Sequence, residues 1–218
     1  MLIAFEGIDC VGKTMAIKII EKILTDKGYL VTTENDWKSS YTQELKDIVI
    51  HNRDQLSQLF TVLIARRYMN SPLQARLKEF DVVLQDRYSL STLVYQDVLT
   101  LHPELLPHIE ECTLPHELFY IRPTPEYDRK GFLDKRDNRN RIDDSWKQGE
   151  WLKMYEFILA GHRQIADNTK ARKVLQWEYV YKVDNDGTDK FAERVTHMAD
   201  KIAERIDAEK RMKQEHEL

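Results

Sequence analysis

Cysteine is scarce and long apolar runs are absent in this chain of 218 residues. The two cysteines, Cys10 and Cys112, fit neither a zinc-binding spacing nor a disulfide framework, so we expect two reduced thiols. No apolar run approaches the roughly 20 residues that cross a bilayer, and residues 1–6 lack the basic region and long apolar stretch of a signal peptide. We therefore expect a cytoplasmic protein without a membrane partner.

A large excess of either charge is also missing. Lys and Arg number 33 against 37 Asp and Glu, which gives a formal net charge of −4. Such a balance creates no strong field, so a basic nucleic-acid-binding module is disfavoured and no nucleic-acid partner is expected. Hydrophobic residues make up 42% of the chain, within the globular range. With no internal repeat or linker, residues 1–218 are predicted to form one domain.

Short apolar segments alternate with helical patterns along the chain. We predict strands at 2–6, 29–33, 82–84, 117–121 and 181–183. Helices are predicted at 15–27, 42–51, 54–78, 146–170 and 191–206. This alternation favours an α/β fold, in which a five-stranded parallel sheet carries helices on both faces.

Three segments carry more specific expectations. In the 54–78 helix, Pro72 should split or kink the helix, and an apolar set should point inward: Leu56, Leu59, Phe60, Leu63 and Ile64. Residues 131–144, GFLDKRDNRNRIDD, are highly charged and predict a solvated loop or lid. The polar tail at 209–218 should fray.

A phosphate-binding loop follows the first predicted strand. Residues 7–14, GIDCVGKT, match G-x-x-x-x-G-K-[ST] between an apolar strand and a helix. Glycines there let backbone N–H groups turn toward phosphate oxygens. Lys13 would add a positive charge at the β- and γ-phosphates, and the Thr14 hydroxyl could ligate Mg²⁺. The loop predicts nucleotide binding without fixing the reaction, but the chain has no Asn-Lys-x-Asp guanine reader of a regulatory GTPase.

A second polar group follows the third predicted strand, in QDRYSLSTLVYQ at 85–96. Asp86 comes at the carboxyl end of a parallel strand, where open α/β sheets bind ligands, and could reach Mg²⁺ or its waters. Arg87 could bind a phosphate through two N–H groups. The two motifs predict that a phosphate donor and an acceptor meet at this edge of the sheet.

These motifs resemble those of the thymidylate kinase family, whose members phosphorylate dTMP with ATP. The family loop is close to F-E-G-x-D-x-x-G-K-T, matched by residues 5–14, and its later motif is close to D-R-Y-x-x-S-x-x-A-Y-Q, matched by residues 86–96 with Val94 in place of alanine. Further similarity at 115–121, 141–143 and 183–185 extends it over essentially the whole chain. The resemblance implies the phosphate-loop nucleoside monophosphate kinase fold with a short lid.

The resemblance also implies roles for individual residues. ATP would be bound by Gly7, Asp9, Cys10, Val11, Gly12, Lys13, Thr14 and Met15, and Mg²⁺ by Thr14 and Asp86. The acceptor would contact Asp9, Leu63, Arg67, Arg87, Ser91 and Tyr95, with Tyr95 against the ribose 2′-carbon to favour deoxynucleotides. Family members carry a catalytic arginine in the phosphate loop or in the lid. Because Cys10 and Val11 supply none, Arg136, Arg139 and Arg141 are the candidates beside Lys13 and Arg87.

The main departures from the family concern the base. A family Phe-x-Ala-x-Arg run stacks phenylalanine on thymine and binds the base through arginine; here Leu63 replaces the phenylalanine and Arg67 is retained. Phe60, one turn earlier, either substitutes for that ring or packs in the core. The loop at 33–37, TENDW, keeps the family's glutamate as Glu34 but lacks its arginine and glycines. Arg122 stands where the family usually has an acidic residue.

The sequence thus predicts a kinase that transfers the γ-phosphoryl group of Mg·ATP to a deoxynucleoside 5′-monophosphate, most simply dTMP, with a base specificity that is broader than usual. A homodimer is expected from the resemblance. Two alternatives stay open: a deoxynucleoside kinase, although that family prefers Glu-Arg-Ser where this chain has Asp86-Arg87-Tyr88, and a nucleotide-binding regulator without turnover.

Overall fold

Five strands form a single parallel sheet in the computed structural model, which describes residues 1–51, 54–124, 145–168 and 173–216. The strand order is β2-β3-β1-β4-β5, with every neighbouring pair parallel. The strands span Leu2–Glu6 (β1), Val31–Glu34 (β2), Val82–Asp86 (β3), Glu117–Pro123 (β4) and Tyr179–Asn185 (β5). The predicted fold class is confirmed, and the strand boundaries either agree with the predicted ones or shift by at most two residues.

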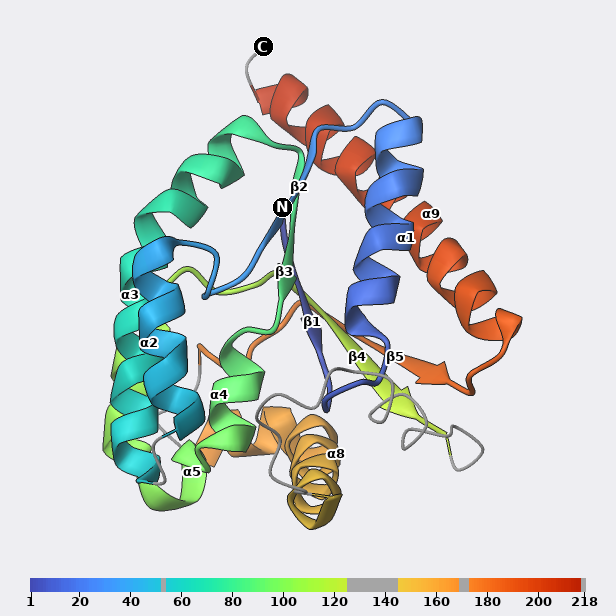
Figure 1. Cartoon of the computed structure of the whole chain (residues 1–218). Helices are drawn as coiled ribbons and strands as arrows, with labels where there is room; N and C mark the ends of the chain where they lie inside the picture. The colour runs from blue at the N-terminus through green and yellow to red at the C-terminus, as the bar shows by residue number, and fades with distance from the viewer. Residues whose placement is uncertain (52–53, 125–144, 169–172, 217–218) are drawn as a thin grey trace.

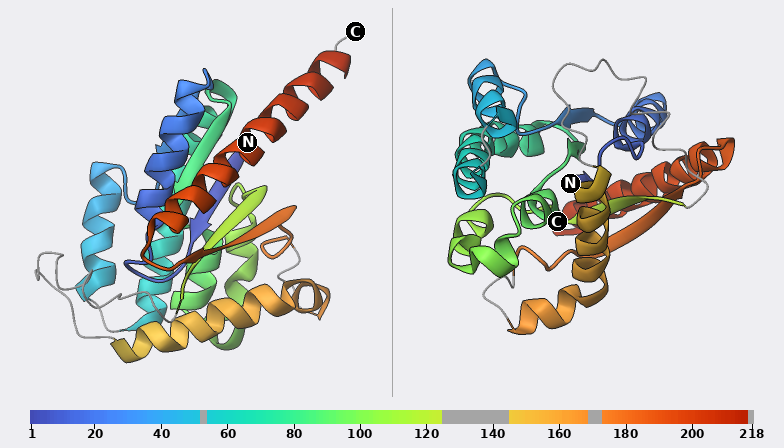
Figure 2. Two further views of the ribbon diagram at one scale, coloured as in Figure 1. Left: turned by 90° about the vertical axis from the view of Figure 1, so that its right-hand side faces the viewer. Right: turned by 60° about the horizontal axis from the view of Figure 1, so that its bottom comes forward.

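Helices cover both faces of the sheet (Figure 1). The larger helices are α1 (Lys13–Asp26), α2 (Ser40–His51), α3 (Gln55–Glu79), α4 (Ser89–Tyr95), α8 (Ser145–Asn168) and α9 (Asp189–His216). Short helices α5 (Val98–Leu101), η1 (Pro103–Leu105) and α6 (Leu106–Glu110) connect α4 to β4. Helices α1 and α9 lie side by side on one face, and α3, α4 and α8 lie toward the other (Figure 2). The core therefore sits on both sides of the central strands β1, β3 and β4, which are almost fully buried.

The inward face of α3 differs from the predicted one. Leu59 and Leu63 are buried as expected, but Leu56, Phe60 and Ile64 are 37%, 46% and 49% exposed. Helix α3 also buries Val62, Arg66 and Leu73, because it packs on the sheet through the 59, 62, 66, 73 row. The row at 60, 64 and 68 is turned outward beside α2. The expectation that Leu56, Phe60 and Ile64 point inward was therefore wrong.

Pro72 does not split α3, since the helix runs from Gln55 to Glu79. The other predicted outcome, a kink at the proline, stays a prediction. Proline cannot donate the hydrogen bond to the carbonyl four residues earlier. That carbonyl belongs to Tyr68, whose residue is 51% exposed, so water can reach this turn. Leu73, the next residue, is buried and anchors the second half of the helix.

The polar tail is helical rather than frayed up to His216, where the description of α9 ends. Its residues are mostly good helix formers, such as Ala, Glu, Lys, Arg and Met. Tertiary contacts add to this propensity, because Lys210 Nζ lies 2.8 Å from Asp81 Oδ1 and 5.4 Å from the centre of the Tyr29 ring. The predicted lid at 131–144 lies outside the described residues.

Candidate functional site

The phosphate loop joins β1 to α1 at the carboxyl edge of the sheet. Its two glycines have positive φ angles, 137° at Gly7 and 100° at Gly12. A Cβ atom at Gly7 would lie 2.4 Å from the Ile121 carbonyl oxygen, and one at Gly12 would lie 2.7 Å from Asn185 Nδ2. Both the backbone angles and the close packing therefore require glycine.

Lys13 begins α1 and turns back over the loop. Its Nζ donates hydrogen bonds to the carbonyl oxygens of Gly7, at 3.0 Å, and Ile8, at 2.7 Å. Burial of the ammonium group, aided by the nearby positive charge of Arg87, lowers the pKa of Lys13 to about 7. The Lys13 amine therefore lies where an anion would bind, and it can take up a proton when the anion arrives.

Thr14 and Asp86 come together across two elements. The Thr14 hydroxyl on α1 donates to Asp86 Oδ2 at the end of β3, at 3.3 Å. A hydroxyl and a carboxylate are the hard oxygen ligands that Mg²⁺ takes in nucleotide sites. These two residues therefore fit a magnesium ion held jointly with phosphate oxygens.

Arg87 lies beside the phosphate loop. Its Nη2 donates to Asp9 Oδ1 at 2.6 Å, and its Nη1 donates to the Gly7 carbonyl at 3.0 Å and to Ser91 Oγ at 3.2 Å. The guanidinium also lies 4.9 Å from the centre of the Tyr95 ring. The structure thus brings together four of the six predicted acceptor residues, since Asp9, Ser91 and Tyr95 all contact Arg87.

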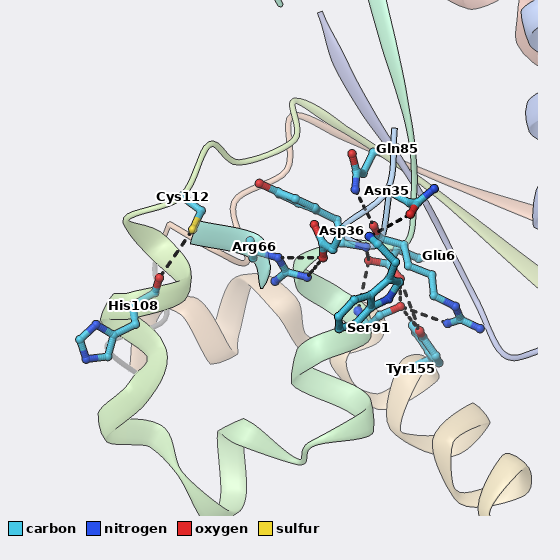
Figure 3. Close-up of polar contacts among 12 residues, drawn as sticks. Glu6, Asn35, Asp36, Arg66, Gln85, Ser91, His108, Cys112 and Tyr155 are labelled. Atoms are coloured by element: carbon cyan, nitrogen blue, oxygen red, sulfur yellow. Dashed lines mark hydrogen bonds and ion pairs between the residues drawn. The ribbon is translucent and has the colours of Figure 1, made fainter. Parts of the chain in front are cut away.

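Glu6 is fully buried. Figure 3 shows its carboxylate near Ser91 and Tyr155. Its Oε1 accepts the backbone N–H groups of Tyr88, at 2.8 Å, and Ser91, at 3.1 Å, while Oε2 accepts the hydroxyls of Ser91 and Tyr155. Burial raises the pKa of Glu6 despite the hydrogen bonds from Ser91 and the charge of Arg87. Glu6 therefore ties the start of α4 to β1 and α8.

Aromatic rings close the α8 side of the site. The Tyr95 ring meets Trp151 edge to face at a centroid distance of 4.3 Å, and Tyr155 stacks on Tyr120 at 5.4 Å. Burial raises the pKa of Tyr95 to about 12, so its hydroxyl is neutral at ordinary pH. This wall is apolar and suits the carbon face of a sugar.

Three predicted site residues are not among the described contacts of Arg87. Leu63 is 5% exposed within α3. Arg67, which has an exposed side chain, pairs with Glu111. Met15 is 53% exposed and lines a surface hollow with Thr14, Lys18, Ile19 and Lys22, so it lies next to a residue of the phosphate loop. The lid candidates Arg136, Arg139 and Arg141 lie outside the described residues.

Sequence reasoning missed two contributors to the site. Asn185, at the end of β5, donates from Nδ2 to the Val11 carbonyl at 2.8 Å and so braces the phosphate loop. Arg66, rather than Arg67, is the buried arginine of α3, and it pairs with Asp36 beside the Glu6 group (Figure 3). The Trp151 and Tyr155 spacing of four residues on α8 was a readable signal for the aromatic wall. Asn185 lies 174 positions from Val11, so no local sequence pattern indicates that it contacts the phosphate loop.

Neither Cys10 nor Cys112 forms a disulfide in the described part of the chain. Cys10 adopts a positive φ of 59° within the phosphate loop, and Cys112 is buried. Among the helices of residues 1–51, 54–124, 145–168 and 173–216, none has the length and apolar composition of a membrane span.

Comparison with known proteins agrees with this geometry. The chain is 35% identical to the thymidylate kinase of Neorickettsia sennetsu over 99 residues, which is 44% of this chain and 50% of that relative. It is 25% identical to the thymidylate kinase of Mycoplasmopsis agalactiae over 189 residues, 80% of this chain and 86% of that relative. The match to the first of these relatives thus spans half of that protein's length.

The fold is also similar to a solved structure. The crystal structure of thymidylate kinase from Ehrlichia chaffeensis superposes with a TM-score of 0.62 at 16% identity, over 91% of this chain and 97% of that one. The profile of the thymidylate kinase family matches residues 5–151, more than half of the chain. The chain therefore belongs to the thymidylate kinase family.

Proposed function

We propose that this protein transfers the γ-phosphoryl group of ATP to dTMP, giving dTDP and ADP. The observation that carries this proposal is the pairing of Arg87 with Asp9, at 2.6 Å, against the phosphate loop that holds Lys13. A donor-phosphate loop and an arginine suited to an acceptor phosphate thus share one edge of the sheet. Phosphoryl transfer needs mainly positioning and charge stabilisation, which such an arrangement supplies.

On the donor side, backbone N–H groups of the loop and Lys13 would bind the β- and γ-phosphates. The hydroxyl of Thr14 and the carboxylate of Asp86 would hold Mg²⁺, which neutralises phosphate charge when bound. Lys13 would exchange its two carbonyl contacts for phosphate oxygens. Its positive charge would then oppose the negative charge that spreads over the transferred group.

On the acceptor side, Arg87 would hold the 5′-phosphate in line with the γ-phosphate. Asp9 would accept the sugar 3′-hydroxyl while it orients Arg87, and Tyr95 would pack against the 2′-carbon. A 2′-hydroxyl would meet this apolar ring, so ribonucleotides should react more slowly. We further propose that residues 1–218 form one kinase domain and that Arg136, Arg139 and Arg141 include the arginine that completes the transition-state charge.

The proposed activity predicts a distinct substrate pattern. In a coupled assay of ADP release, dTMP should be phosphorylated, and a second deoxynucleoside monophosphate should react within about 10²-fold of its kcat/KM, because Leu63 offers no aromatic face to the base. The corresponding ribonucleoside monophosphates should have a lower kcat/KM. Phosphorylation of thymidine in preference to dTMP would point instead to a deoxynucleoside kinase, and ADP release that no acceptor stimulates would point to a regulator.

A matched pair of variants tests the role of Leu63 in this pattern. Leu63→Phe should raise the preference for dTMP, while Leu63→Met, which keeps the volume and adds no ring, should leave it near the native value. Selectivity for dTMP above about 10⁴ in the native chain would show that no aromatic ring is needed here.

Protonation of Lys13 provides a second test. Since its pKa is about 7 in the free protein, most of the amine is neutral at pH 8. ATP phosphates stabilise the charged form, so binding should take up close to one proton at pH 8 and less at pH 6. Calorimetric titration with ATP in two buffers of different ionisation enthalpy measures this uptake. Lys13→Met should abolish the difference between buffers; an equal uptake in that variant would assign the proton to another group.

We also propose a homodimer formed through an outward apolar face of α2 and α3. This face comprises Tyr41, Ile48, Leu56, Phe60, Ile64 and Tyr68, which are 37% to 51% exposed. The Tyr41 and Tyr68 rings contact each other at 4.8 Å, so the two helices present one continuous surface. Apolar side chains gathered in this way are typical of an interface between protein chains.

We place the enzyme in the cytoplasm, where ATP and deoxynucleotides are supplied.

Light scattering during size-exclusion chromatography tests the dimer. The native protein should show twice the chain mass, and Phe60→Glu with Ile64→Glu should show the mass of one chain, because each buries a charge in the proposed interface. Phe157→Glu on α8 is a suitable control, since Phe157 is 66% exposed outside this face. A native mass of one chain would refute the proposed interface.

A further inference from the structure

Arg66 and Asp36 form a buried ion pair next to the acceptor side of the site. Arg66 on α3 donates from Nη2 to Asp36 Oδ2 at 2.9 Å and from Nε to the same oxygen at 3.3 Å. Their side chains are only 2% and 9% exposed. Because removing two charges from water is costly, such a pair is weak evidence for added stability and calls for another explanation.

The pair lies against the ring of Tyr88. The Arg66 guanidinium is 4.5 Å from the centre of this ring, a distance at which cation and ring attract each other. Tyr88 is 1% exposed, and its hydroxyl has no hydrogen-bond partner within the described residues. The orientation of Tyr88 therefore depends on the contact of its ring and on its backbone, not on its hydroxyl.

Tyr88 follows directly after Arg87, whose backbone is strained. Arg87 has a φ of 65°, in the left-handed region that is unfavourable for a residue other than glycine. Hydrogen bonds hold it on both sides: Arg87 N–H donates to the Phe5 carbonyl, Gln85 Nε2 donates to the Arg87 carbonyl, and Tyr88 N–H donates to Glu6. The β3–α4 turn is thus held by hydrogen bonds to β1 and by the contact between the Tyr88 ring and Arg66 of α3.

We propose that Asp36 and Arg66 are a positioning pair, which clamps Tyr88 and thereby keeps Arg87 in the conformation that binds the acceptor phosphate. The loop after β2 supplies Asp36 and α3 supplies Arg66, and Figure 3 shows the two side chains facing each other. The β3–α4 turn carries Tyr88 and Arg87, so the pair joins three segments. This inference rests on the proposed function, in which Arg87 binds the acceptor. The pair touches no part of the phosphate loop in the contacts described above, so the ATP side should be unaffected.

Kinetics with both substrates test the positioning role. Arg66→Met should raise the KM for dTMP about 10-fold and leave the KM for ATP within twofold. Because that variant leaves Asp36 buried without its partner, the double variant Asp36→Asn with Arg66→Met removes both charges and should recover stability but not the KM for dTMP. Arg66→Lys keeps a cation near the ring and should be intermediate.

A matched control separates positioning from general destabilisation. Arg205 pairs with the buried Glu117 at 2.6 Å near the amino ends of β4 and β5, far from the carboxyl edge. Arg205→Met should lower the melting temperature as Arg66→Met does but leave both KM values unchanged. If the stable double variant binds dTMP like the native protein, or if both KM values rise together, the positioning role is wrong.

Hydrogen exchange keeps this test independent of the reaction. In the double variant, the amide of Tyr88 should exchange about 10-fold faster relative to that of Leu84, a core residue of β3, while the ratio stays unchanged in Arg205→Met. An unchanged ratio overturns the proposed clamp even if the native protein is an active dTMP kinase. A changed ratio in a protein that does not phosphorylate dTMP would support the clamp and refute the proposed function.

Discussion

Replacing Lys13 with alanine is expected to lower kcat at least 100-fold, while the protein remains folded. The ammonium group is buried at the phosphate loop on the Gly7 and Ile8 carbonyls, and it would oppose charge on the transferred phosphoryl group once it exchanges these contacts for phosphate oxygens. Losing one donor of this kind typically costs about 10²–10³ in turnover. Steady-state kinetics with saturating ATP and dTMP measures the loss, and circular dichroism checks the fold.

The matched control for Lys13 is Lys18 on the same helix. Lys18 is exposed one turn further along α1, so Lys18→Ala removes an equal charge and should keep kcat within twofold. A near-native turnover of Lys13→Ala would mean that the loop binds ATP without using this amine in the reaction.

Replacing Arg87 with lysine should lower kcat/KM for dTMP about 100-fold and change the KM for ATP little. Arg87 uses both terminal nitrogens, one on Asp9 and one on Gly7 and Ser91, which a single ammonium group cannot reproduce. Lysine is preferable to alanine as a first variant because it retains the charge and isolates the effect of the planar fork. The two substrates should be titrated separately.

Arg76→Lys serves as the control for this arginine. Arg76 has an exposed side chain near the end of α3, where it pairs with Glu34 and Glu79. The same chemical change there should leave kcat/KM for dTMP within twofold. If Arg87→Lys weakens ATP and dTMP equally, the assignment of Arg87 to the acceptor is incorrect.

Much of the fold was predictable because local pattern and burial coincide in a parallel sheet. The apolar strands β1, β3 and β4 are buried on both faces, so they appear as continuous apolar runs. The phosphate loop was equally readable, since Gly7 and Gly12 have backbone angles that glycine favours. In these strands and in this loop, burial or the backbone angle at each position is enough to determine which type of residue is found there.

The rotation of α3 could not be read in the same way. Both of its long sides carry apolar residues, and Leu59 faces the sheet while Phe60 faces outward beside α2. Only the packed structure decides which side is buried. A polar residue, Arg66, then occupies the inner row, and its partner Asp36 lies 30 positions earlier in a loop without regular structure. A buried ion pair formed at such a separation leaves no periodic signal.

The contact between Asn185 and Val11 has a consequence for the order in which the protein is made. The phosphate loop is complete only when a residue 174 positions away has joined it, and Phe191 of α9 would also lie 3.2 Å from a Cβ atom at Gly12. Synthesis proceeds from the amino terminus, so a nascent chain that already contains the family's recognisable motifs still lacks this brace. We therefore expect a nascent chain on the ribosome to bind nucleotide only after β5 and the start of α9 have been synthesised, not as soon as the phosphate-loop motif is present.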